Sequence, residues 1–354
     1  MSDNGIIYTI GLKSENPKYR NNFIASTLHC LINIEILTDY INKLDNKLEG
    51  NPLFVKYKEL LKNLQDLKKK NNKGPYDIKD FEKILFNKEE FQNIDRYNPK
   101  YLLNYLITEF NLFLSSETKN TFISDAFFTI IETINKCPVC DEYLERKKKE
   151  VQYLNYDLYQ YKFKKNKDEK KEEKEKEEEK EEEEENNIYD CLKSYVNIEE
   201  KEREIYCEHC KKTVKSKDTV LFQKLPKHLI IYVDYGDDIN FKLDDIITFN
   251  KELYFSKIKK VEKDFQDWEY YLSSLISVKE IMKQNEYFYT FCKEIDQKEK
   301  YICYNADIVQ EVLSIDNKTD NKKIEFNNKK ERFPFILIYT SLNKKENKNK
   351  NKNK

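Results

Sequence analysis

Apolar residues follow two different spacings along this chain, and the spacing changes near its first cysteine pair. From Asn22 to about Ile134 the apolar positions recur mostly every three or four residues, which is typical of amphipathic helices. The clearest runs are FIASTLHCLINIEILTDYI (23–41), VKYKELLKNLQDLKK (55–69) and KYLLNYLITEFNLFL (100–114). This part of the chain is therefore predicted to be helical.

After Cys137 the pattern changes to short runs rich in aromatic and β-branched residues, as in β-strands. These runs are EVQYLNYDLYQY (150–161), TVLFQKL (219–225), HLIIYVDY (228–235), EYYLSSLISV (269–278), YFYTFCKEI (287–295), KYICYN (300–305) and PFILIYT (334–340). Helices first and strands afterwards predict the α+β class, with antiparallel sheet in the second half. No internal repeat interrupts this order.

Two segments lack any apolar face. Residues 164–187, KKNKDEKKEEKEKEEEKEEEEENN, are nearly all charged, and the tail from Asn343 is basic. Such segments cannot bury enough apolar surface to fold, so we expect a solvated insertion and a disordered tail. An acidic insertion can also recruit basic partners, and that alternative stays open.

Composition limits the function classes. The 354 residues are 39% hydrophobic and 14% aromatic, enough for the core of one large or two small domains. The net charge of -1 creates no global field, so neither direct nucleic-acid binding nor membrane binding is expected. Without a signal-peptide pattern or a membrane-length apolar window, we expect an intracellular protein of the cytoplasm or nucleus. Its eight cysteines then predict thiols or metal ligands rather than disulfides.

Two Cys-x-x-Cys pairs predict a metal site. Cys137 and Cys140 lie in CPVC, and Cys207 and Cys210 lie in CEHC. Each pair can form a tight knuckle, and four thiolates satisfy a tetrahedral structural Zn²⁺. The alternative is four unrelated thiols, and His209 in the second pair can also replace a cysteine as ligand. A closed site of this kind stabilises a finger and performs no catalysis.

Several stretches, taken in order, resemble blocks of the ubiquitin-specific proteases, the ubiquitin carboxyl-terminal hydrolases. The resemblance covers about residues 8–340, and the zinc pairs are its intact motifs. The similar stretches are Gly11-Leu12 with NNFIASTLHCL (21–31), NPKYLLNYLI (98–107), TINKCPVC (133–140), the run from IYDCLKS to LIIYV (188–233), FKLDDIITFNKEL (241–253), EYFYTFCK (286–293), KYICYNADIV (300–309) and PFILIYT.

This resemblance implies a papain-like cysteine protease fold with thumb, palm and fingers, the finger being stapled by Zn²⁺. It also implies ubiquitin, a ubiquitin-like protein or a protein complex as partner. The implied parts are a helical thumb at about 20–134, a zinc finger at about 135–162 and 189–218, and a palm sheet at about 219–340, besides the insertion at 164–187 and the tail at 343–354.

The resemblance assigns the catalytic positions of the family to residues of this chain, and the residues at the nucleophile and base positions cannot perform those roles. The nucleophile's place falls on Asn22, the base's on Tyr287 and the third group's on Asn305. Asparagine is no useful nucleophile, and a phenol with a pKa near 10 is no base around neutrality. Asn305 is expected to be a turn or strand-end residue, because this block has no histidine for it to orient. No register shift helps, because Lys13–Thr27 contains no cysteine.

The remaining candidates for catalysis are few. Cys292 and Cys303 lie in alternating strand sequence and are expected to be structural, as is Cys30 in the first helix. Glu286 is a possible base, but it has no nucleophile to serve.

The three histidines of the chain, His29, His209 and His228, fall outside the block where the family has its base.

The leading hypothesis is a catalytically inactive ubiquitin-specific protease-like domain that acts as a binding or scaffold module. One alternative is an active but divergent cysteine-type deubiquitinase. The other is a scaffold in a splicing or deadenylation assembly, because two known members of the family without activity serve there.

Overall fold

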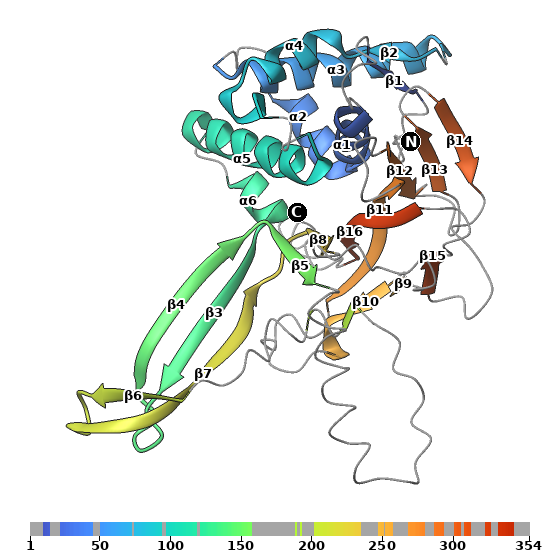
Figure 1. Ribbon diagram of the computed structural model, residues 1–354. Coiled ribbons are helices and arrows are strands. Elements are labelled where there is room, and N and C mark those ends of the chain that lie inside the picture. The colour runs from blue at the N-terminus through green and yellow to red at the C-terminus, as the bar shows by residue number, and fades with distance from the viewer. Residues whose placement is uncertain are drawn as a thin grey trace, which may run out of the picture. The chain divides into compact units, whose positions relative to one another are not determined.

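The structure is a computed structural model (Figure 1). It describes residues 10–14, 22–44, 50–72, 74–93, 97–118, 121–157, 188–189, 192, 202–234, 247–250, 252–257, 268–279, 287–293, 301–305, 308–312, 323–326 and 332–342. The predicted insertion at 164–187 and the tail at 343–354 lie outside these residues. The chain divides into two compact units. The first is Met1–Ala126, Asp237–Ile247 and Leu272–Ile338, and the second is Phe127–Gly236, Thr248–Tyr271 and Tyr339–Lys354.

Among the described residues, helices α1 to α6 precede the strands, apart from the two-residue strands β1 and β2, which confirms the α+β class. The helices are α1 (Asn22–Ile32), α2 (Glu35–Lys43), α3 (Pro52–Lys69), α4 (Lys79–Phe86), α5 (Pro99–Thr118) and α6 (Phe122–Phe127). The strands are β1 (Leu12–Lys13), β2 (Tyr76–Asp77), β3 (Thr129–Lys136), β4 (Tyr143–Val151), β5 (Tyr153–Asp157), β6 (Glu202–Cys207), β7 (Lys212–Lys224), β8 (His228–Asp234), β9 (Ile247–Asn250), β10 (Glu252–Tyr254), β11 (Glu269–Lys279), β12 (Tyr287–Lys293), β13 (Tyr301–Asn305), β14 (Ile308–Val312), β15 (Lys323–Phe326) and β16 (Arg332–Ser341).

The helices of the first unit pack through aromatic side chains. At the start of α3, the Asn51 side chain accepts a hydrogen bond from the Phe54 N–H at 3.0 Å, and Pro52 occupies the first turn. The Phe110 ring of α5 then meets the rings of Phe54 and Tyr57 at 5.3 and 5.2 Å between centroids. Within the described part of the chain, the helices lack the combination of length and apolar character that crossing a bilayer requires.

Truncating Phe110 should destabilise the first unit strongly. Phe110 is 1% exposed, so Phe110→Ala leaves a cavity among the rings and is expected to lower the free energy of unfolding by about 3–5 kcal/mol. Leu112→Ala on the same helix is the control, because Leu112 is 60% exposed and its loss should cost less than about 0.5 kcal/mol. Urea denaturation measures both, and equal losses would contradict this packing.

The sheet of the first unit carries α1 on one side. Its strands follow the order β14-β13-β12-β11-β16, and the pairings from β11 to β14 are antiparallel. Helix α1 contacts β12 and β13. Ten consecutive residues of α1, from Phe23 to Ile32, are buried, because the sheet and α5 both cover this helix.

The second unit contains an antiparallel four-stranded sheet in the order β4-β3-β7-β6, which we call the finger sheet (Figure 1). The prediction that the helical pattern continues to about Ile134 is wrong at its end, since β3 begins at Thr129. Five of the seven residues in TIIETIN (129–135) are β-branched, and β-branched side chains favour an extended backbone. The buried Glu132 carboxylate accepts two hydrogen bonds from Arg146 of β4, at 3.0 and 3.1 Å, which joins the two strands.

Candidate functional site

The finger sheet brings the four predicted metal ligands together. Cys137 and Cys140 lie in the turn after β3. Cys207 is the last residue of β6, and Cys210 lies in the turn between β6 and β7. Their four Sγ atoms all lie within 4.8 Å of one another. The shortest distances between the pairs are 3.7 Å from Cys140 to Cys207 and 3.9 Å from Cys137 to Cys210. Cysteines that are separated by 67 and 73 positions along the chain therefore belong to one cluster.

Both turns have the same local geometry. The Asp141 N–H donates to the Cys137 carbonyl at 2.9 Å, and the Lys211 N–H donates to the Cys207 carbonyl at 2.8 Å. Asp141 and Lys211 both adopt positive φ angles, 59° and 56°. A residue in this conformation reverses the chain after the second cysteine, so both thiols of a pair face the same point.

The electrostatics of the cluster favour a bound cation. Burial opposes ionisation of Cys137, but hydrogen bonds from backbone N–H groups, of Cys140 first, outweigh it and lower its pKa to about 7. The Cys140 thiol and then burial raise the pKa of Cys210 to about 12. Thiolates this close together cannot all ionise unless a positive ion compensates their charge, and such an ion removes the conflict.

Two of the three predicted catalytic positions, Asn22 and Tyr287, lie where α1 meets β12. Asn22 is the first residue of α1, and its Nδ2 donates a hydrogen bond to the Phe288 carbonyl at 3.0 Å. Ser26 Oγ, one helical turn later, donates to the same carbonyl at 3.1 Å. Thr290 Oγ1 returns a hydrogen bond to the Ser26 carbonyl at 2.9 Å. We call these three contacts the α1–β12 hydrogen bonds.

The structure gives the backbone positions of Tyr287 and Asn305. Tyr287 is the first residue of β12, adjacent to the Phe288 carbonyl that Asn22 contacts, and Asn305 is the last residue of β13. Their side chains lie outside the described part of the structure. The backbone therefore brings the first two positions close together and leaves the third at the end of the neighbouring strand.

The other described thiols are buried in the first unit. Cys30, Cys292 and Cys303 are 0%, 1% and 5% exposed. Burial raises the pKa of Cys30 well above its usual value and that of Cys292 to about 12. Ser274 Oγ lies 3.7 Å from Cys292 Sγ as a hydrogen-bond donor. Buried thiols with raised pKa values stay protonated at neutral pH, so Cys30 and Cys292 are poor nucleophiles.

The three histidines have different environments. His29 is buried, and its ring stacks on Tyr304 with centroids 4.1 Å apart. His209 is exposed in the second cysteine turn. His228 is buried in the second unit, with Nδ1 at 3.0 Å from Thr340 Oγ1. Burial, and then the charge of Lys227, lower the pKa of His228 to about 3.

Because of His228, the free energy of unfolding should decrease as the pH is lowered from neutral. Its pKa is about 3 in the folded chain and about 6.5 when unfolded, so between these values only the unfolded chain binds the proton. Stability is then lost as pH falls, by about 1 kcal/mol between pH 6 and 5. Urea denaturation at both values tests this against His228→Asn, which keeps a polar atom near Thr340 and cannot titrate. Parallel losses in both proteins would contradict the assignment.

The sequence reasoning did not find Ser26 and Thr290. A signal for Ser26 was present, because a residue four positions after Asn22 lies on the same helical face. No local signal identified Thr290, whose acceptor is 264 positions away along the chain.

Comparisons with known proteins agree with this geometry. A family model described as ubiquitin carboxyl-terminal hydrolase matches residues 16–339. One similar solved structure is described as the SAGA DUB module of Ubp8, Sgf11, Sus1 and Sgf73 bound to monoubiquitin. It aligns with a TM-score of 0.63 and 16% identity, over 95% of this chain and 70% of that chain. At that identity the likeness concerns the fold. No curated protein matches the sequence.

Proposed function

Because the chain belongs to the ubiquitin carboxyl-terminal hydrolase family, we propose that it is a catalytically inactive member that binds ubiquitin, a ubiquitin-like protein or another protein partner. The observation that carries this proposal is the hydrogen bond from the Asn22 side chain to the Phe288 carbonyl. Asn22, at the position of the nucleophile, donates a hydrogen bond to β12 and offers no electron pair for attack.

The chemistry of isopeptide cleavage explains why this substitution matters. A cysteine protease needs a thiolate that attacks the carbonyl and a base that takes the thiol's proton. An amide nitrogen has no free electron pair for attack, and the tyrosine at position 287 is a poor proton acceptor. Loss of the nucleophile or the base alone lowers kcat by about 10⁶ in a triad hydrolase.

Ubiquitin is proposed as the first partner to test. The similar structure described above contains monoubiquitin and three further proteins. Loss of catalytic residues need not remove the binding surface of a fold. The partner of this chain is therefore proposed to be ubiquitin itself, a ubiquitin-like protein, or a member of a protein complex.

Zn²⁺ is proposed as the ion of the cysteine cluster. With Zn–S bonds of about 2.3 Å, the edges of a tetrahedral four-thiolate site measure about 3.8 Å. The Sγ distances of 3.7 and 3.9 Å between the two pairs fit this geometry. Soft thiolate ligands also favour zinc over magnesium or calcium. Since four protein ligands fill the coordination sphere, the ion's role would be structural.

Two measurements test the proposed function together. Ubiquitin carrying a C-terminal electrophile labels an active-site thiolate, so we expect no covalent product with this protein by mass spectrometry. An active member of the family serves as positive control for the probe. Labelling of a single cysteine would establish the active-deubiquitinase alternative. Calorimetry with unmodified ubiquitin should show binding, and its absence at about millimolar concentration would rule ubiquitin out as partner.

A further inference from the structure

The finger sheet carries a groove that neither the cysteine cluster nor the degenerate catalytic positions explain. The groove measures about 610 Å³ and is lined from β3, β4, β7 and the first cysteine turn. Every charged side chain in its lining is a lysine, namely Lys136, Lys215 and Lys217. Ile134 and Leu221 form an apolar part of the same lining.

Strand register places these residues on one face of the sheet. Ile134 pairs with Thr219 across β3 and β7, and Lys136 pairs with Tyr143 across β3 and β4. Side chains two positions apart in a strand share a face, so Lys215 and Lys217 project beside Thr219. A row of ammonium groups therefore borders an apolar strip.

Tyr143 lines the groove, and its exposed ring is restrained by contacts with two cationic side chains. It is 51% exposed, yet Lys136 Nζ lies 4.9 Å and Arg146 Cζ 4.7 Å from its ring centroid. Contacts of cations with the ring faces reduce its freedom before any partner arrives. Fixed aromatic side chains next to arginine are typical of the residues that dominate the binding energy of protein interfaces.

Two carboxylates, those of Asp141 and Glu204, are weak competitors for Lys136 and Lys215. Lys136 pairs with Asp141 at 3.1 Å, but Asp141 is 82% exposed. Glu204 lies opposite Lys215 across β6 and β7, and its side chain is also exposed. Exposed ion pairs contribute little to stability because water screens them, so these carboxylates can be exchanged for those of a partner.

We propose that this groove is a docking surface for an acidic segment of a partner protein. Carboxylates of that segment would contact the three lysines, and one apolar side chain between them would lie against Tyr143, Ile134 and Leu221. A protein fits better than a nucleic acid, because a single exposed aromatic residue in the groove provides no platform for successive bases. The proposal goes beyond ubiquitin binding and does not depend on it.

Fluorescence anisotropy with the full chain tests the proposal directly. The probe is a short labelled peptide of glutamates flanking leucine and phenylalanine, and its counterpart has every glutamate replaced by lysine. We expect only the acidic peptide to bind, with an affinity that falls as salt increases. Equal binding of both peptides, or of neither, would overturn the proposal.

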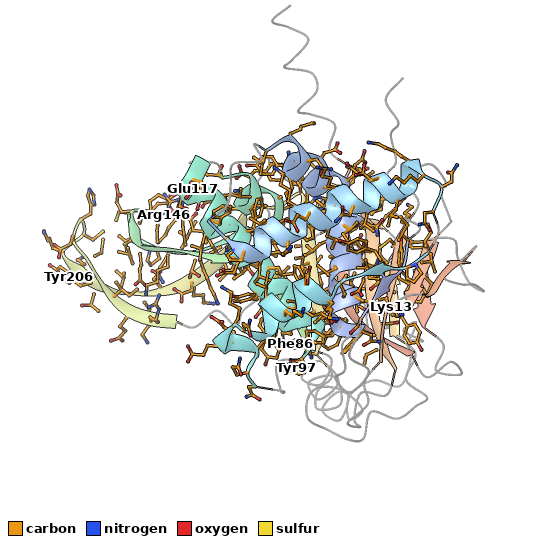
Figure 2. The ribbon with its side chains drawn as sticks, turned by 90° about the horizontal axis from the view of Figure 1, so that it is seen from above. Lys13, Phe86, Tyr97, Glu117, Arg146 and Tyr206 are labelled. Atoms are coloured by element: carbon orange, nitrogen blue, oxygen red, sulfur yellow. The ribbon has the colours of Figure 1, made fainter. Side chains whose placement is uncertain are left out.

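Matched variants locate the binding. Tyr143→Ala and Lys215→Glu should each weaken the acidic peptide about tenfold. Tyr206→Ala and Lys212→Glu should leave its affinity within about twofold. Tyr206 is 50% exposed, against 51% for Tyr143, and lies on β6 (Figure 2), the edge strand opposite β4 in the finger sheet. Neither control residue lines the groove. Equal effects of the two pairs in folded proteins would overturn the proposal.

Three other possible occupants of the groove would each give a distinct result, and each of these results would overturn the proposal. Displacement of the acidic peptide by free ubiquitin would assign the groove to ubiquitin, and displacement by single-stranded RNA would assign it to nucleic acid. If removal of residues 164–187 tightens peptide binding about tenfold, the chain's own acidic insertion occupies the groove. Under the proposal, none of the three changes the measured affinity.

Discussion

A Cys207→Ser variant is expected to lose its zinc and to unfold the finger sheet while the first unit stays folded. Cys207 ends β6, and its Sγ lies 3.7 Å from that of Cys140, so its loss opens the proposed metal site. Structural zinc contributes about 10–16 kcal/mol in zinc-finger peptides, which is comparable to or greater than the stability of a whole domain. Metal analysis by mass spectrometry should fall from about one zinc per chain to almost none. Hydrogen exchange of β3, β6 and β7 should accelerate at the same time.

His209→Ala is the matched control for this experiment. His209 lies in the same cysteine turn, is exposed, and is the open alternative as a metal ligand. If the four thiolates bind the ion, His209→Ala keeps the zinc and the protection of the finger strands. Zinc loss in His209→Ala would make His209 a ligand, and unchanged zinc content in Cys207→Ser would contradict the four-thiolate site.

The double variant Asn22→Cys with Tyr287→His is expected to gain reactivity toward the ubiquitin electrophile. Position 22 begins α1, where the free N–H groups and the helix dipole lower the pKa of a thiol. The contact of Asn22 with the Phe288 carbonyl places position 22 next to the backbone of the residue that follows position 287. Because restoring nucleophile and base reverses the two losses, labelling should rise by about 10³-fold or more over the unmodified chain.

Three single variants serve as controls for the expected gain in labelling. Tyr287→His alone should give no labelling, because a base without a nucleophile has no function, and Asn22→Cys alone should react slowly. Ser26→Ala removes a second hydrogen bond to the Phe288 carbonyl without adding a thiol, so it reports the effect of weakening the α1–β12 hydrogen bonds alone. If the folded double variant binds ubiquitin but is not labelled, the assignment of positions 22 and 287 is wrong.

Much of the helical region was readable from local spacing. The run predicted as helical at 55–69 lies within α3, and that at 100–114 lies within α5. The run at 23–41 is divided into α1 and α2, because the chain turns at Asn33 and Ile34. At the end of α1 the His29 carbonyl accepts two hydrogen bonds from Asn33, one from its backbone N–H at 3.2 Å and one from Nδ2 at 2.8 Å. Spacing alone does not reveal this break, because apolar residues continue across it.

The strand β3 shows the opposite case. Its residues follow α6 directly, and the apolar positions of 129–134 fit a helix or a strand about equally well over so short a run. Pairing with both β4 and β7 decides in favour of the strand, since it satisfies the hydrogen bonds of β3 on both edges.

The sequence by itself determined the residue types on which the proposed function depends: four cysteines in two close pairs, an asparagine at position 22 and a tyrosine at position 287. These are local facts, because a side chain's chemistry does not depend on the fold. Only the tertiary structure decided that the cysteine pairs meet within 4.8 Å and that Asn22 is bound to Phe288, 266 positions away. Contacts over such separations depend on how helices and strands pack, and that information is spread over the whole core rather than contained in any one motif.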